Sequence, residues 1–246
     1  MHCLELPTFN VVIAGGGGIS QALLEALKQM PGLNKAIVLA RNPPKHSDSD
    51  NVIYLTMDAE QPDSIVQAAK QTGEHVDRVH LLINTVGVLH DDTLRPEKSL
   101  KAVNQESLLR SFAINAAFLP LLAQAFSALM RHDEPAMLAS LSARVGSIED
   151  NQSGGWYSYR AAKAAQNMLL RTLAREWRLS HPRTTVLALH PGTVDTRLSQ
   201  PFVTASYRKR VLTPDECAAA LLKVMASLST SDSGSFHDWQ GESIPW

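Results

Sequence analysis

Cysteine is scarce in this chain, with only Cys3 and Cys217 among 246 residues. Two cysteines so far apart exclude a disulfide framework and any C-x-x-C metal or redox motif. The nine histidines form no H-E-x-x-H or comparable pattern, so the sequence predicts no metal site. A cytoplasmic location is the expectation that follows.

An excess of charge of either sign is also missing, since 23 basic and 24 acidic residues leave a formal net charge of -1. Because the protein has no net positive charge to attract polyanions, neither nucleic acid nor an anionic membrane is the expected partner. No stretch approaches the roughly 18 apolar residues of a membrane span. The N-terminal apolar run breaks into glycines, which is more typical of a strand than of a signal peptide. We therefore expect a small-molecule partner.

Short aliphatic runs alternate with segments of helical spacing along the whole chain. We expect strands at residues 9–14, 36–40, 52–56, 79–84, 136–141 and 185–190, and helices at 19–30, 64–72, 108–130 and 157–179. Alternation of this kind predicts one α/β domain over residues 1–246. It would be a doubly wound, Rossmann-type parallel sheet of about seven strands with helices on both faces. In such folds ligands bind beyond the carboxyl ends of the strands.

A glycine-rich turn, Gly15 to Ser20, follows the first expected strand and leads directly into a helix. Backbone N–H groups and a helix N-terminus placed in this way can bind a pyrophosphate, and missing β-carbons let it approach closely. We predict a dinucleotide cofactor contacted by Gly15, Gly18 and Ile19. The alternative is a purely structural turn.

The second expected strand ends in Ala40-Arg41-Asn42, where an acidic residue would accept hydrogen bonds from an adenosine ribose. Arginine cannot accept them, but its guanidinium can pair with a 2′-phosphate. Arg41 therefore favours NADP over NAD, with a solvated arginine as the alternative.

Tyr159 and Lys163 stand four residues apart at the start of a long helical run, so they share one helix face. A nearby ammonium favours phenolate and would lower the tyrosine pKa. Such a tyrosine can protonate a carbonyl oxygen while hydride arrives.

With these motifs in place, the whole chain resembles the short-chain dehydrogenase/reductases. Within them it is most similar to the sniffer-like carbonyl reductases and the bacterial C-factor proteins, through residues 146–151, 157–167 and 241–246. The resemblance implies that Asp58 meets the adenine beside Asn84, Thr85, Val86 and Gly87. It also implies that Asn115 holds a water of the proton relay, and that Lys163 and Tyr159 contact the cofactor. Nicotinamide contacts would come from Pro191, Gly192, Thr193, Val194 and Thr196.

Three departures from the family pattern are visible. The glycine turn is one residue short, with Ala14 and Ser20 at its ends, and Thr85 and Val86 replace an asparagine and an alanine. The third departure is Ala143, which occupies the position of the family's catalytic serine. We assign that role to Ser142, one position earlier, with Ser147 as the second candidate. A binding or signalling protein of the C-factor type, with weak catalysis, is the alternative function.

Other residues carry weaker expectations. Asp91 and Asp92 are expected to be solvated loop carboxylates, and His190 a histidine satisfied by backbone partners. Trp156 could line the substrate pocket or pack under the helix, and residues 196–211 could form a flap or a plain loop. The two long alanine- and leucine-rich helices suggest, by resemblance, a homodimer.

Overall fold

The structure is a computed structural model, and it describes residues 2–44, 49–204, 207–208 and 210–246. The Ser-, Asp- and Pro-containing stretch 43–50 is predicted from the sequence to be a surface loop, and its residues 45–48 lie outside this part. So do residues 205, 206 and 209 of the segment 196–211, which is expected to be a flap or a plain loop.

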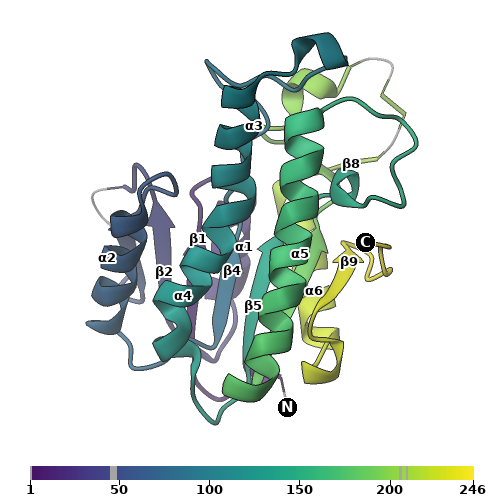
Figure 1. Cartoon of the computed structure of the whole chain (residues 1–246). Coiled ribbons are helices and arrows are strands. Elements are labelled where there is room, and N and C mark those ends of the chain that lie inside the picture. Colours follow the sequence, from purple (N-terminus) through teal and green to yellow (C-terminus); the bar gives the residue numbers. More distant parts are fainter. Residues whose placement is uncertain (1, 45–48, 205–206, 209) are drawn as a thin grey trace.

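Seven parallel strands form one sheet in the order β3-β2-β1-β4-β5-β6-β9 (Figure 1). The strands are β1 (Phe9–Ala14), β2 (Leu33–Ala40), β3 (Val52–Thr56), β4 (Leu81–Asn84), β5 (Ala136–Leu141), β6 (Thr184–His190) and β9 (Ser235–Asp238). The order runs outward from β1 in both directions, so the sheet is doubly wound. The expected fold class is confirmed.

Two helical layers enclose this sheet (Figure 1). Helices α1 (Gly18–Lys28) and α6 (Pro214–Ser227) pack together on one face. Helices α2 (Pro62–Gly73), α4 (Phe118–Met130) and α5 (Tyr157–Ser180) cover the other, and α3 (Gln105–Phe112) leans on α5. Every residue of β1, β4 and β5 is buried, as expected when both faces are covered.

The sequence expectation missed four features of this architecture. Helix α6 and strand β9 were not predicted, and a two-stranded sheet joins β7 (Thr193–Val194) to β8 (Val211–Leu212). The helix expected at 108–130 is broken into α3 and α4 by a π-helical turn at Ala113–Ala117.

The helical run Gln105–Met130 has the length and composition of a membrane span, contrary to the expectation that no stretch approaches one. Its inner face is buried in the core, with Phe118, Leu122 and Phe126 almost inaccessible to solvent. Arg110 on the same run forms two ion pairs. The α4 part of this run therefore packs in the core of the fold.

Candidate active site

A cleft of about 660 Å³ opens beyond the carboxyl ends of β1 to β4. Nine residues expected to contact a cofactor line it: Gly15, Gly18, Ile19, Arg41, Asp58, Thr85, Val86, Gly87 and Thr196. Asn84, Pro191, Gly192, Val194, Tyr159 and Lys163 are not among the lining residues. The structure therefore brings together the residues expected at the phosphates and adenosine.

The glycine turn lines the cleft, and its glycines are needed for different reasons. Gly15 has φ +126°, and a β-carbon there would lie 2.1 Å from Oγ1 of Thr85. Gly17 caps α1, and a β-carbon on it would meet nothing within 4 Å. The N-terminus of α1 is thus accessible to an anion without side chains in the way.

The two departures at this turn contact each other. Ser20 is buried, and its Oγ lies 2.7 Å from Oγ1 of Thr85, which also donates to the carbonyl of Ala14 at 2.9 Å. These hydroxyls join α1 to the ends of β1 and β4.

Arg41 and Asp58 follow β2 and β3 at the far end of the cleft. Arg41 is exposed, so its guanidinium is free to turn toward a ligand phosphate. The Asp58 carboxylate accepts a hydrogen bond from the backbone N–H of Glu60 at 3.0 Å. Both residues therefore line the part of the cleft formed after β2 and β3.

The other predicted contacts support loops at the cleft. Buried Asn84 accepts a hydrogen bond from the Val86 N–H at 3.0 Å and donates to Oγ of Ser140 at 2.9 Å. Gly192 has φ +78°, and a β-carbon on it would lie 2.8 Å from the Trp239 ring. Val194 is buried in β7.

Tyr159 and Lys163 are buried on the first turns of α5, at 8% and 2% exposure. The Lys163 Nζ lies 5.8 Å from the centroid of the Tyr159 ring, so the spacing argument placed both on one face correctly. Burial raises the pKa of Tyr159 above its usual value, and burial lowers the pKa of Lys163 to about 7. The expected lowering of the tyrosine pKa is therefore wrong for this structure, because desolvation dominates. The phenol stays protonated, as a general acid requires.

Gln166, which the sequence reasoning missed, holds the Lys163 ammonium. Nζ of Lys163 donates to Oε1 of Gln166 at 2.8 Å and to the Leu141 carbonyl at 3.0 Å. The amide of Gln166 donates in turn to Ser140 at 2.7 Å. A buried polar chain thus runs from Lys163 to Asn84.

Asn115 sits in the π-helical turn, a feature that often marks functional sites. Its side chain exchanges two hydrogen bonds with the backbone of Val88, at 2.8 and 2.9 Å. A β-carbon on Gly87 would lie 3.3 Å from the Asn115 Oδ1 and 3.6 Å from the Lys163 Nζ. Asn115, Gly87 and Lys163 therefore meet beside the cleft.

Both serine candidates make a hydrogen bond, Ser142 as a donor and Ser147 as an acceptor. Ser142 is buried and donates from Oγ to the side chain of Asn167 at 2.6 Å. The Ser147 Oγ accepts a hydrogen bond from the backbone N–H of Asp150 at 3.1 Å. A single hydroxyl proton cannot serve Asn167 and a substrate carbonyl fully at once.

Aromatic rings stand beside Tyr159. The Trp156 ring lies 6.3 Å from Tyr159 and 4.9 Å from Phe202, which in turn lies 5.7 Å from His90. Trp156 has φ 51°, and its backbone N–H donates a hydrogen bond to the backbone carbonyl of Glu97 at 2.6 Å. Trp156 thus lies next to both Tyr159 and Phe202.

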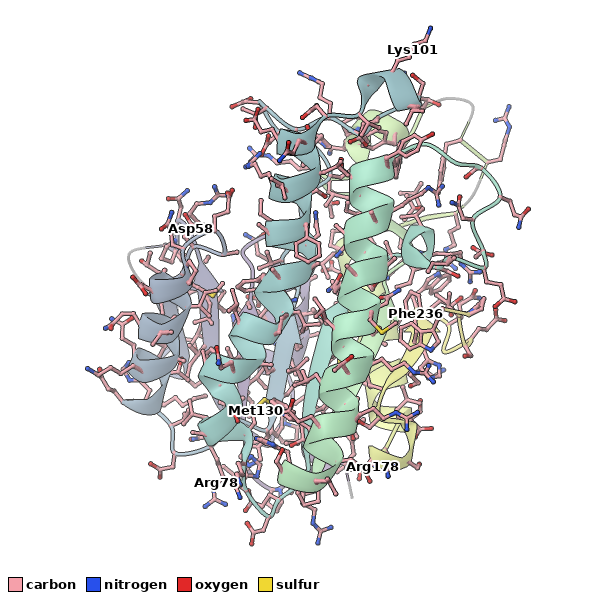
Figure 2. All side chains as sticks on the ribbon, viewed as in Figure 1. Asp58, Arg78, Lys101, Met130, Arg178 and Phe236 are labelled. Atoms are coloured by element: carbon pink, nitrogen blue, oxygen red, sulfur yellow. The ribbon has the colours of Figure 1, made fainter. Side chains whose placement is uncertain are left out.

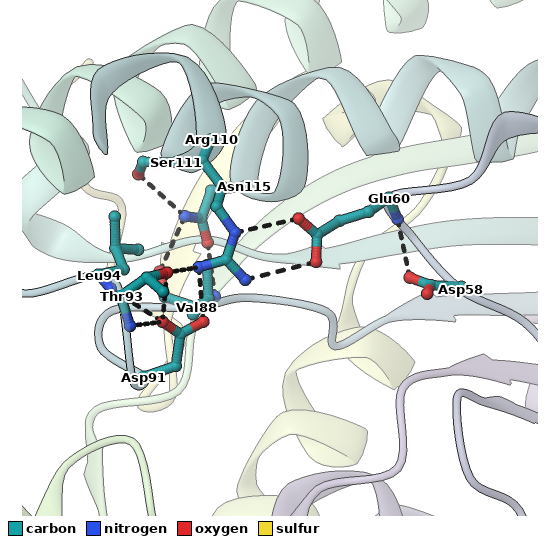
Figure 3. A network of polar contacts seen from close by, with 9 residues as sticks. All are labelled: Asp58, Glu60, Val88, Asp91, Thr93, Leu94, Arg110, Ser111 and Asn115. Atoms are coloured by element: carbon teal, nitrogen blue, oxygen red, sulfur yellow. Dashed lines mark hydrogen bonds and ion pairs between the residues drawn. The ribbon is translucent and has the colours of Figure 1, made fainter. Parts of the chain in front are cut away.

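Arg110 was missed by the sequence reasoning, and it organises the polar network of Figure 3. Its guanidinium pairs with the carboxylates of Glu60 and Asp91. The expectation that Asp91 is simply solvated is therefore wrong. No periodic pattern in the sequence joins these three residues, which come from three separate segments.

A protein-family model described as short chain dehydrogenase matches residues 9–206. The chain is 39% identical over 114 residues to the 1-hydroxy-2-glutathionyl-2-methyl-3-butene dehydrogenase of Rhodococcus sp. strain AD45; the match covers 46% of this chain and 48% of the relative. It is 33% identical over 148 residues to the C-signal of Myxococcus xanthus, covering 60% and 84%.

Solved structures agree with the sheet and helix arrangement. NADPH-bound carbonyl reductase from chicken fatty liver superposes with a TM-score of 0.85 at 26% identity, covering 97% of this chain and 100% of that one. Carbonyl reductase Sniffer of D. melanogaster shares the fold, with a TM-score of 0.84 at 21% identity and the same coverage.

Proposed function

The chain belongs to the short chain dehydrogenase family, and from this we propose that it reduces an aldehyde or ketone with NADPH. The observation that carries the proposal is the burial of Tyr159 and Lys163 beside a cleft whose open glycine turn fits a dinucleotide. When bound, the nicotinamide supplies hydride.

Tyr159 is the proposed acid. Its buried phenol keeps its proton until a substrate oxygen gains negative charge, and then donates it. Lys163 stabilises the charge left on the phenol, and Asn115 serves a proton route through the lysine. Ser142 is the proposed second donor to the carbonyl, and it must give up its bond to Asn167 to act.

The preference for NADPH rests on Arg41, an exposed guanidinium at the adenosine end of the cleft. Arginine pairs well with a 2′-phosphate and cannot accept hydrogen bonds from ribose hydroxyls. The chicken carbonyl reductase, with NADPH bound, supports the same choice.

Two further proposals concern the setting. We propose a homodimer formed through α3 and α5, which expose Leu109, Phe112 and Met168 at 60%, 45% and 67%. Light scattering of the purified protein tests it. The proposed location is the cytoplasm, in keeping with two unpaired buried cysteines among the described residues.

The test is a fluorescence titration with NADPH and with NADH, followed by a panel of aldehydes, ketones and quinones added to the tighter complex. We expect tighter NADPH binding and oxidation of NADPH on carbonyl addition. Tyr159→Phe should lose turnover and keep nucleotide binding. Tyr157→Phe, two residues away and 41% exposed, is the matched control and should retain both.

Binding without turnover on any carbonyl would favour the weakly catalytic, C-signal-like alternative. Failure to bind either nucleotide would refute the cofactor assignment altogether.

A further inference from the structure

We propose that Arg110 is a positioning residue of the cofactor cleft: by pairing with Glu60 and Asp91 it offsets part of the negative charge that a phosphorylated dinucleotide would otherwise meet on entering. The inference rests on the proposed NADPH binding, but it concerns residues outside the family motifs identified in the sequence.

The geometry places one cation between two carboxylates on the cleft wall (Figure 3). Nε of Arg110 lies 3.1 Å from Oε1 of Glu60, and Nη2 lies 3.4 Å from Oε2, so this contact is bidentate. Nη1 lies 2.7 Å from Oδ2 of Asp91 and 2.9 Å from Oγ1 of Thr93. The guanidinium therefore joins α3 to the segments after β3 and β4.

The backbone of Glu60 and the carboxylate of Asp91 are each held by contacts other than Arg110. The N–H of Glu60 donates to Asp58, which the family resemblance places at the adenine. Asp91 accepts the N–H groups of Thr93 and Leu94 at 2.9 and 2.8 Å. Burial disfavours its charged form, but these bonds and Arg110 outweigh burial and lower the pKa of Asp91 to about 2. Loss of Arg110 would leave two negative charges facing the cleft.

The charges along the cleft balance only with Arg110 present. The cationic lining residues are Arg41, Arg110 and Arg197, and the anionic ones are Asp58, Glu60 and Asp91. NADPH brings a pyrophosphate and a 2′-phosphate, so repulsion from unpaired carboxylates acts directly against binding. Exposure near 30% for the three paired side chains means that this repulsion is screened by salt.

The network also reaches the catalytic end. Asn115 lies five residues after Arg110 and holds the backbone of Val88, three residues before Asp91 (Figure 3). Arg110 and Asn115 thus fasten the same loop from the same helical run. A purely structural role for Arg110 is the competing explanation, and the experiment has to separate the two.

The experiment measures the Kd for NADPH by fluorescence at about 50 mM and about 500 mM salt, where the Debye length falls from roughly 14 Å to roughly 4 Å. We expect Arg110→Met to weaken binding about five- to tenfold at low salt and much less at high salt. Adding Glu60→Gln should recover most of the loss, and Arg110→Lys, which keeps the charge, should bind nearly as well as wild type.

Arg78→Met is the matched control. Arg78 pairs with Glu134 at 3.0 Å at the other end of the sheet, far from Asp58 in Figure 2, and its loss should leave the Kd unchanged. Thermal melts without nucleotide report whether each variant is folded.

Glu60→Gln alone keeps the proposal testable if Arg110→Met does not fold, because removing one carboxylate should tighten NADPH binding at low salt. Weaker binding by Glu60→Gln, or a loss in Arg110→Met that neither salt nor Glu60→Gln relieves, would overturn the proposal. If wild type binds NADPH and Arg110→Met binds it equally well, this inference alone fails. If wild type binds no nucleotide, the proposed function fails with it.

Discussion

The hydroxyl of Ser20 lies 2.7 Å from the hydroxyl of Thr85, although the two residues are 65 positions apart. Each looked in the sequence like a separate departure from the family pattern. In the structure they form one hydrogen bond, and the missing β-carbon of Gly15 leaves the space that Thr85 occupies. The shortened glycine turn is thus held by a contact that the usual residues would not make.

Thr85→Val should lower the free energy of unfolding by about 1 to 2 kcal/mol, because Ser20 and the Ala14 carbonyl lose a buried partner. Chemical denaturation measures this, with Ser20→Ala as the comparison. We expect the double variant to lose less than the sum of the two single losses. Strict additivity would show that the hydroxyls act independently.

Ala143→Ser should raise kcat for carbonyl reduction by about tenfold or more, since a donor would stand at the family position. If Ser142 is the working donor, Ser142→Ala lowers kcat and Ser142→Ala/Ala143→Ser restores it. Unchanged kcat in Ser142→Ala would remove Ser142 from the mechanism and leave it as a partner of Asn167.

Gln166→Leu should shift the pH dependence of kcat/KM for reduction toward lower pH. Oε1 of Gln166 accepts a hydrogen bond from the Lys163 ammonium and so favours its charged form. Without that acceptor the lysine loses its proton at lower pH. Gln166→Glu, which restores an acceptor, should move the profile back. A uniform drop in rate with no shift would indicate a packing role only.

Lys163 should also make stability depend on pH. Burial lowers its pKa to about 7 in the folded chain, below its ordinary value of 10.5. The unfolded chain therefore binds more protons above about pH 7, and stability rises with pH there. Urea unfolding of wild type and Lys163→Met between pH 6 and 9 isolates this effect. From pH 7 upward, the free energy of unfolding of the wild type should rise relative to that of the variant. A difference that stays constant with pH would contradict the prediction.

Strands with near-continuous aliphatic runs were predictable from the sequence. β1, β3 and β5 match the expected bounds. Burial on both faces explains the aliphatic runs of β1 and β5. β9 has only four residues, including His237 and Asp238, and its pairing with β6 cannot be read from its own composition. The local sequence pattern therefore does not predict a strand such as β9, which forms because it pairs with a neighbouring strand.

The candidate site also contains some features that were predictable from the sequence and others that were not. Tyr159 and Lys163 follow from four-residue spacing on one helix, and the glycine turn from its place between strand and helix. The contact of Arg110 with Glu60 spans 50 residues, and the hydrogen bond of Ser142 to Asn167 spans 25. Only the path of the folded chain brings such partners together.

The π-helical turn at Ala113–Ala117 determines how the faces of α3 are rotated, about the helix axis, relative to the faces of α4. Each residue of an α-helix advances the chain by 100°, so deleting one residue here would rotate Arg110 relative to the buried face of α4 by roughly that angle. That one deletion would remove both the ion pairs of Arg110 with Glu60 and Asp91 and the hydrogen bonds of Asn115 to Val88. Length changes in this segment are therefore far less tolerable than substitutions, and we expect functional variants of the protein to differ here in side chains but not in residue count.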